Sequence, residues 1–316
     1  MISRGDRPMI ELYNLHRFFG RTRAVDNISF TVREGNVFGY IGPNGAGKTT
    51  SMRILATLDH PTYGDAYVDG FSVVDDPDHV RRRLGFMPDY FGAYANVNVY
   101  EYLDFFARSY GLRGKDRLKA LKYTMGFTKL DGLAEKPMTG LSKGMKQRLC
   151  LGRAMIHNPS VLVLDEPAAG LDPRARIQLR EMIRELADKG TTILISSHIL
   201  TELAEMCDTV GIIEQGQLLA MGTVEEIRGE TAEHAAVHIQ TLDEMPRLLA
   251  WLHAREDVAQ VSSEGKNVRF DFQGDKDAQA KLLKELVQEN FPIIAFGAKE
   301  RSLEEVFMSI TEGKVQ

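Results

Sequence analysis

A glycine-rich segment of eight residues, Gly42-Pro-Asn-Gly-Ala-Gly-Lys48-Thr49, constrains the fold of this chain more than any other feature. It matches the pattern G-x-x-x-x-G-K-[ST] in full, follows an expected strand at Asn36 to Ile41 and precedes an expected helix from near Lys48. Because the pattern requires this strand–loop–helix context, a chance glycine-rich turn is the weaker interpretation. Backbone N–H groups of such a loop and of the helix N-terminus surround an anion, so the segment predicts a phosphate site.

A short apolar run, Val161 to Leu164, ends in two acids, Asp165 and Glu166. The run is typical of a strand that is buried on both sides. Two acids at a strand end more often form an exposed turn, but the phosphate loop favours a functional interpretation here. Asp165 then holds Mg²⁺, directly or through water, and Glu166 orients and deprotonates an attacking water.

The remaining groups of this predicted site belong to the loop itself. Lys48 reaches the β- and γ-phosphates, and the Thr49 hydroxyl is placed for Mg²⁺. Downstream, Asp172-Pro173 predicts the start of a helix, and Gly190 its end. A second apolar strand follows at Thr191 to Ile195, which completes a strand–helix–strand unit and implies a parallel sheet. A further stretch, from about Asn98 to Met125, has helical periodicity.

The charge of the chain is unevenly distributed. Its 39 Lys and Arg against 44 Asp and Glu give a formal net charge of −5, which argues against a nucleic-acid binder that works by bulk positive charge. Residues 223–316 hold 18 acidic and 11 basic residues, a local charge of −7, and the rest of the chain holds 26 and 28, a local charge of +2. This shift predicts a domain boundary near residue 223, with domains 1–222 and 223–316.

The second domain has its own pattern of elements. A capping box at Thr223 and Glu226 opens a short helix, and another at Ser302 and Glu305 opens the last one. Between them the order is strand, helix, strand, strand, helix, strand, which is the ferredoxin-like α+β pattern. The expected elements are Ala235 to Gln240, Asp243 to Ala254, Val258 to Ser262, Val268 to Phe272, Asp277 to Glu289 and Ile293 to Phe296.

Neither cysteine usage nor hydropathy indicates an exported or membrane-spanning chain. Cys150 and Cys207 are far apart, which suits a reducing cytosol better than a disulfide framework. No apolar run approaches the roughly 18 residues that span a bilayer. The N-terminus is polar and lacks the apolar core of a signal peptide. We therefore expect contact with a membrane only through a partner.

The segment Leu141-Ser-Lys-Gly-Met-Lys-Gln-Arg148 carries a family resemblance, because it looks like the LSGGQ signature of ATP-binding-cassette (ABC) transporters. It lies 24 residues before Asp165, as in that family. Ala169 to Asp172 resembles the family's D-loop, and His198 resembles its switch histidine. Phe19 resembles the aromatic residue of the A-loop. From Ile10 to Met221 the chain thus resembles the nucleotide-binding subunit, a P-loop α/β cassette with a mixed sheet and a helical subdomain at about residues 92–158.

The resemblance implies ATP and Mg²⁺ as cofactors and a site shared between two cassettes. Ser142 and the Gly144 backbone of one cassette would bind the γ-phosphate of the ATP held by the other. Phe19 would stack on adenine, although a core phenylalanine is an alternative. Glu166, His198 and Lys48 would be catalytic. The implied nucleotide contacts are Phe19, Gly42, Pro43, Asn44, Gly45, Ala46, Gly47, Lys48, Thr49, Thr50, Ser142, Gly144 and Asp172; the implied metal ligands are Thr49, Asp165 and Asp89.

Two departures from the family pattern are informative. Lys143 and Met145 replace the usual glycine and glutamine of the signature. Asp89 stands where the Q-loop usually has glutamine. At 4 Å from a phosphate oxygen and an effective dielectric of 20, a carboxylate meets about 4 kcal/mol of repulsion, so it is tolerable only beside Mg²⁺ or turned away. Our hypothesis is that Asp89 faces the metal; an exposed loop acid is the alternative.

Seven aromatic residues follow the Q-loop position. For those in the expected helix we favour the core of the helical subdomain; for those in the loop, a groove for the coupling helix of a membrane partner is an equal alternative. The loop members are Tyr90, Phe91 and Tyr94, and the helical members are Tyr100, Tyr102, Phe105 and Phe106.

The leading hypothesis is the ATPase subunit of an ABC transporter, similar to bacterial drug-resistance-type exporters that carry a C-terminal domain. The expected partners are a transmembrane permease subunit and a second cassette, identical or paralogous, with no nucleic acid. The expected location is cytoplasmic, peripheral on the inner face of the membrane. One alternative is a soluble cassette protein acting on ribosomes or DNA; the single phosphate loop and the absence of heptads count against it. Another is a regulatory dimer that hydrolyses ATP poorly.

Overall fold

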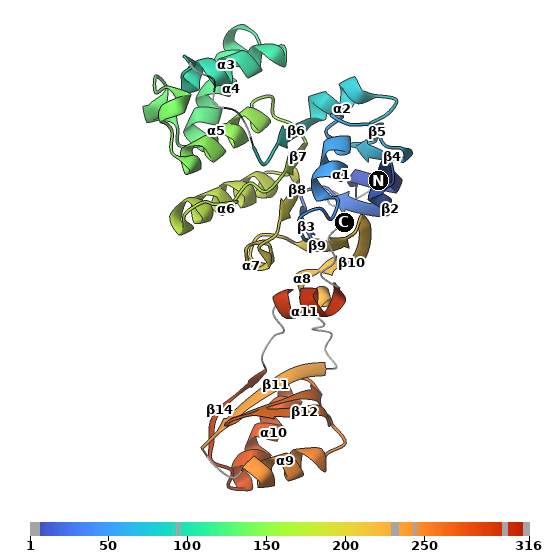
Figure 1. Ribbon diagram of the computed structural model, residues 1–316. Coiled ribbons are helices and arrows are strands. Elements are labelled where there is room, and N and C mark those ends of the chain that lie inside the picture. Colours follow the sequence, from blue (N-terminus) through green and yellow to red (C-terminus); the bar gives the residue numbers. More distant parts are fainter. Residues whose placement is uncertain are drawn as a thin grey trace. The chain divides into compact units, whose positions relative to one another are not determined.

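Figure 1 shows the computed structural model, which describes residues 7–90, 92, 94, 96–228, 234–242, 245–298 and 303–311. The chain divides into two compact units; the first contains the residues up to Met221, and the second spans Gly222–Ser309. Three features expected from the sequence lie outside the described residues: the helix start at Asp243, the capping residue Ser302 and the aromatic Phe91.

An antiparallel sheet occupies the N-terminal part of the first unit. Its order is β2-β1-β4-β5. The strands are β1 (Pro8–Phe19), β2 (Thr22–Arg33), β4 (Tyr63–Val68) and β5 (Phe71–Ser72). Along β1, Ile10, Leu12 and Leu15 are buried, and a bulge between Leu12 and Leu15 keeps Leu15 on the inner face. The alternating apolar residues from Ile28 to Val32 predict a strand, which is the second half of β2, but the sequence did not reveal the other three strands.

A second sheet, of six strands, forms the centre of this unit. Its order is β10-β9-β3-β8-β7-β6. The strands are β3 (Val37–Ile41), β6 (Leu84–Met87), β7 (Val161–Leu164), β8 (Thr192–Ser197), β9 (Thr209–Glu214) and β10 (Gln217–Thr223). The pairs β3–β8, β7–β8 and β6–β7 are parallel, which confirms the parallel sheet expected from the strand–helix–strand unit. The carboxyl ends of β3, β7 and β8 therefore meet at one edge.

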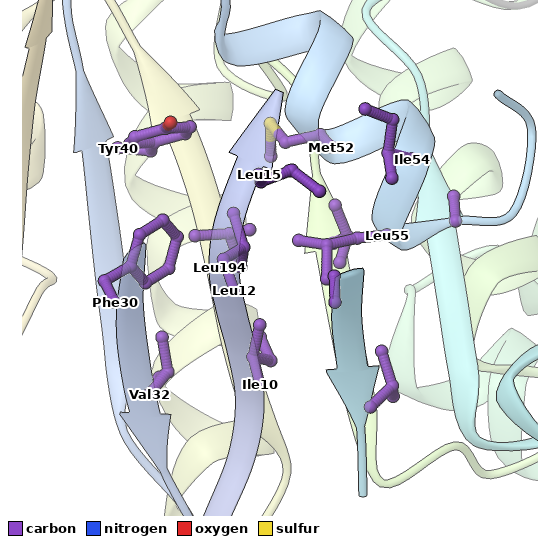
Figure 2. Close-up of a cluster of buried hydrophobic side chains, with 14 of the residues drawn as sticks. Ile10, Leu12, Leu15, Phe30, Val32, Tyr40, Met52, Ile54, Leu55 and Leu194 are labelled. Carbon is purple, nitrogen blue, oxygen red and sulfur yellow. The ribbon is translucent and has the colours of Figure 1, made fainter. Parts of the chain in front are cut away.

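Both sheets share a core with helix α1 (Lys48–Leu55), which starts at the residue expected from the sequence. Figure 2 shows Leu12 and Leu15 of β1, Met52 of α1 and Leu194 of β8 in this cluster. These side chains are at most 1% exposed, so the inner side of α1 is packed firmly against both sheets.

Helix α6 (Pro173–Asp188) has the predicted ends. The Asp172 side chain accepts a hydrogen bond from the Ala175 N–H at 2.9 Å, and Pro173 occupies the first turn. Its buried face includes Leu179, Met182 and Ile183, whose spacing places them on one side of the helix. Gly190, with φ +94°, follows the helix in a conformation that favours glycine. Two short helices, α2 (Pro77–Arg83) and α7 (Leu200–Ala204), complete this part.

The helical part contains α3 (Val99–Ser109), α4 (Gly114–Phe127), two 3-10 turns (Asp131–Leu133, Met138–Gly140) and α5 (Lys143–Met155). The stretch from about Asn98 to Met125 is helical, as its periodicity predicted, but it forms two helices, because Gly111 adopts φ +80° and separates α3 from α4. The predicted aromatic core is also only partly correct. Tyr102 is buried at 3% exposure, but Phe105 is 63% exposed and Tyr100 37%.

The second unit has the expected ferredoxin-like sheet. The order is β12-β13-β11-β14, with every pair antiparallel. Val268, Phe270 and Phe272 alternate inward along β13 toward the helices. The elements are α8 (Val224–Arg228), β11 (His234–Thr241), α9 (Met245–His253), β12 (Val258–Glu264), β13 (Asn267–Gln273), α10 (Lys276–Gln288), β14 (Ile293–Ala298) and α11 (Leu303–Ile310). Throughout the described ranges, no helix combines the length and the apolar character that crossing a bilayer requires.

Candidate active site

The loop between β3 and α1 has the geometry of an anion cradle. Gly45 and Gly47 adopt φ +82° and +104°, which side chains rarely tolerate. A Cβ atom at Gly42 would clash with the Ile213 carbonyl oxygen, and one at Gly47 with that of Ala24. Gly47 also precedes the first turn of α1 without a side-chain cap. The first N–H groups of α1 therefore remain available to an anion.

Lys48 closes this cradle with a buried positive charge. Its side chain is 6% exposed, and its Nζ donates hydrogen bonds to the carbonyl oxygens of Gly42 at 2.6 Å and Pro43 at 3.1 Å. Burial lowers the pKa of Lys48, while the nearby charges of Glu166 and Asp165 raise it. Carbonyl oxygens and carboxylates thus keep the ammonium group oriented inside the loop.

Asp165 follows β7 at the same edge and is 1% exposed. Its Oδ1 accepts a hydrogen bond from the Ser196 hydroxyl at 2.6 Å, whereas Oδ2 is buried without a hydrogen-bond partner among the described residues. Burial raises the pKa of Asp165; the Ser196 and Thr49 hydroxyls lower it, and the charges of Asp89 and Glu166 raise it. An unpaired carboxylate oxygen near a hydroxyl is a donor set that fits Mg²⁺, which prefers oxygen ligands.

Glu166 lies between two further groups of the site. Its Oε1 is 4.0 Å from Lys48 Nζ, and its Oε2 is 2.8 Å from His198 Nδ1. The backbone of Glu166 has φ +47°, an uncommon conformation for a side chain of this size, and its N–H donates to Ser196 Oγ at 2.9 Å. The structure therefore brings together three predicted residues, Lys48, Glu166 and His198.

Ser196 is a site residue that the sequence analysis missed. It is fully buried in β8, and its one hydroxyl donates to Asp165 and accepts from the N–H of Glu166. The available signal was a polar residue directly after the apolar run Ile193-Leu194-Ile195. A hydroxyl at this position does not contribute to apolar packing. Because β8 pairs with β7 in parallel, the hydroxyl lies beside the end of β7.

Two predicted residues at the edge of the site are exposed. Asp89 accepts a hydrogen bond from the Tyr90 N–H at 2.7 Å, and its charge raises the pKa of Asp165. Phe19 is 50% exposed, so the core alternative for this phenylalanine is excluded. The Arg17 guanidinium carbon lies 4.4 Å from the centre of the Phe19 ring.

The signature segment, Leu141 to Arg148, contains the start of α5, which lies beside the first turn of α6. Ser142 caps α5 by accepting from the Met145 N–H at 3.3 Å, and a Cβ on Gly144 would lie 3.1 Å from Ala175 Cβ of α6. No hydrogen bond or ion pair within the described residues joins Ser142, Gly144 or Asp172 to the phosphate loop. Lys143 turns toward the D-loop, since a Cβ on Gly170 would clash with its Nζ.

Two family models match the chain. One, described as ABC transporter, covers residues 25–169, and the other, described as ATP-binding protein DrrA1-3-like, C-terminal domain, covers residues 222–311. The chain is 31% identical over 308 residues to the Nod factor export ATP-binding protein I of Ralstonia nicotianae, covering 97% of this chain and 95% of the relative. It is 26% identical over 305 residues to the linearmycin resistance ATP-binding protein LnrL of Bacillus subtilis, covering 96% and 98%.

The fold comparison agrees with the sequence comparison. A solved structure titled "Structure of ATP binding subunit of ABC transporter" superposes with a TM-score of 0.65 at 30% identity, covering 70% of this chain and 92% of the other. The phosphate loop, the two acids after β7 and His198 are therefore found in a chain whose sequence and fold match the same family. The chain belongs to the ATP-binding proteins of ABC transporters, a family that binds and hydrolyses ATP.

Proposed function

We propose that this protein is the ATP-hydrolysing subunit that powers an exporter through a separate membrane-spanning permease. The observation that carries the proposal is the contact of Glu166 with both Lys48 and His198 at the edge of the phosphate loop. Export is supported by the printed names of the relatives, which concern Nod factor export and linearmycin resistance. A location on the cytoplasmic face of the membrane, through the permease, is part of the same proposal.

In this proposal each side chain has a defined task. Lys48 neutralises the β- and γ-phosphate oxygens, and Phe19 stacks on adenine. Glu166 accepts the proton of the attacking water, while His198 holds the second carboxylate oxygen in place. Asp165 and Thr49, with Asp89 nearby, would hold Mg²⁺, which spreads the negative charge of the phosphates when it is bound.

The proposal also includes a second copy or a paralogue of this cassette. Ser142 and Gly144 lie at the start of α5, where backbone N–H groups are available to an anion. Among the described residues of one chain, no hydrogen bond or ion pair joins these two residues to the phosphate loop. Facing the loop of a second cassette, they would complete the γ-phosphate site, and ATP would hold the two cassettes together.

Purification of this protein with its permease tests the function. We expect the pair to co-purify from detergent-solubilised membranes, and reconstituted vesicles to accumulate or release a candidate cargo only with ATP. ATPase activity should rise with the transported cargo. A chain that hydrolyses ATP fully but never associates with a membrane protein would contradict the transporter assignment and favour the soluble alternative.

The metal role of Asp89 can be tested by replacing it with asparagine. If the carboxylate faces Mg²⁺, Asp89→Asn should raise the Mg²⁺ concentration for half-maximal ATPase activity about tenfold, as outer-shell partners do. Asp75→Asn, in an exposed loop, is the control and should leave this concentration unchanged. Higher ATPase activity with unaltered Mg²⁺ dependence would show that Asp89 instead repels the phosphates.

Ser196 is proposed as a positioning residue, and its replacement by alanine should reduce turnover about 10- to 100-fold, the cost typical of lost outer-shell contacts. The change leaves Asp165 Oδ1 without its donor and the Glu166 N–H without its acceptor. Thr192→Val is the matched control, because it removes another buried hydroxyl of β8 that accepts from the Gly35 N–H. Both variants should lose about 1–3 kcal/mol of unfolding free energy, but only Ser196→Ala should lose turnover. Equal losses of turnover would contradict the assignment.

A further inference from the structure

Arg17 and Asp59 form an ion pair directly behind Phe19. Arg17 Nη2 lies 2.8 Å from Asp59 Oδ1, and the two side chains are only 24% and 20% exposed. The guanidinium carbon of Arg17 lies 4.4 Å from the centre of the Phe19 ring. One face of this ring is thus covered by a partly buried cation, while half of the Phe19 surface remains exposed.

The segment that contains Asp59 is hydrogen-bonded to the end of β1. This segment connects α1 with β4, and the Thr62 N–H donates to the His16 carbonyl oxygen at 2.7 Å. In return, the Phe18 N–H donates to Thr62 Oγ1 at 3.0 Å. Together with the Arg17–Asp59 pair, these contacts give the exposed Phe19 a fixed support. An unsupported surface phenylalanine would lose more rotamer freedom on binding a flat ligand.

From this geometry we propose that Arg17, held by Asp59, is a positioning residue for the base of ATP. It covers the rear face of Phe19, fixes the ring and leaves the opposite face for adenine. A cation over one face of an aromatic ring is attractive, more so when it is desolvated, and the ion pair with Asp59 keeps Arg17 from folding over the base-binding face. The inference rests on the proposed function at one point, the stacking of Phe19 on adenine.

The chain contains a matched arrangement one residue earlier. Arg23 lies 5.5 Å from the centre of the Phe18 ring and pairs with Asp26 at 3.2 Å. Arg23 is 67% exposed, so its contact is the more solvated version of the same chemistry. Arg23→Ala therefore removes an arginine with the same types of partner without touching the support of Phe19.

The experiment distinguishes binding of the base from binding of the phosphates by using two probes, one with the base and one without it. Binding of ADP and of inorganic pyrophosphate to the full chain is measured by titration calorimetry for the wild type, Arg17→Ala, Asp59→Asn, Phe19→Ala and Arg23→Ala. We expect Arg17→Ala to weaken ADP binding about tenfold, the range of a desolvated cation–aromatic contact, with pyrophosphate binding unchanged. Asp59→Asn should weaken it less, and Arg23→Ala should leave both affinities unchanged.

Steady-state kinetics add a second readout, in which Arg17→Ala raises the KM for ATP and preserves kcat. Unchanged or tighter ADP binding in Arg17→Ala would overturn the inference, and so would an equal loss for ADP and pyrophosphate, which indicates a merely structural role. If Phe19→Ala weakens ADP binding but Arg17→Ala does not, the proposed function stands and only this inference fails. If Phe19→Ala has no effect, the assigned base contact fails with it.

Discussion

Replacement of Glu166 by glutamine is expected to abolish ATP turnover while nucleotide binding is retained. Glutamine has nearly the same shape, so the contact with His198 and the position beside Lys48 are preserved. It has no carboxylate to accept the proton of the attacking water. General-base catalysis contributes about 10²- to 10⁴-fold, so we expect kcat to fall by at least two orders of magnitude.

The measurement combines turnover with association. Steady-state ATPase assays give kcat, and size-exclusion chromatography with ATP should reveal a trapped pair of cassettes, because the nucleotide that joins them is no longer cleaved. Glu185→Gln is the matched control; this exposed residue of α6 pairs with Lys189 and should not affect turnover. Turnover comparable to that of the wild type in Glu166→Gln would refute the assignment of Glu166 as the base.

Replacement of Lys48 by methionine should remove ATP hydrolysis by a different route, through loss of phosphate binding. Methionine fills a similar volume, but its thioether cannot neutralise phosphate oxygens or donate to the carbonyl oxygens of Gly42 and Pro43. Loss of one such electrostatic stabiliser costs about 10²- to 10³-fold in turnover, and we expect binding to weaken as well.

The decisive readout for Lys48→Met is thermal unfolding with and without nucleotide. ADP should raise the unfolding temperature of the wild type but not that of the variant. Lys189→Met, at a surface lysine that pairs with Glu185, controls for the loss of a lysine and should respond to ADP normally. A variant that hydrolyses ATP with unaltered KM would show that Lys48 has a structural rather than a phosphate-binding role.

The elements that the sequence predicted correctly have local determinants. The start of α1 follows from the phosphate loop, and the start of α6 follows from Asp172 and Pro173, because capping groups lie next to the residues that they stabilise. The ferredoxin-like order of the second unit was predictable because apolar residues alternate along β11 and β13, and helical periodicity marks the segments between the strands.

The elements that were missed depend on contacts distant in sequence. Strand β1 has bulges, including one at Asn14 with φ +45°, which interrupt the alternation that would reveal a strand. The burial of Tyr102 and the exposure of Phe105 depend on which side of α3 meets α5, and composition does not reveal that. For the same reason Ser196 was missed: its function becomes visible only when β8 is paired with β7.

Helix α1 connects the two halves of the proposed nucleotide site. In the proposed site its first turn would face the phosphates, and the segment that follows its last turn holds Asp59, the partner of Arg17 behind the Phe19 ring. Its eight residues, at 1.5 Å each, make it about 12 Å long. The length of α1 therefore sets the distance between the phosphate loop and the segment that holds Asp59. One inserted residue would lengthen α1 by about 1.5 Å and rotate its far end by about 100°. Asp59 and the support of Phe19 would then be displaced relative to the phosphate loop, so one nucleotide could no longer reach both.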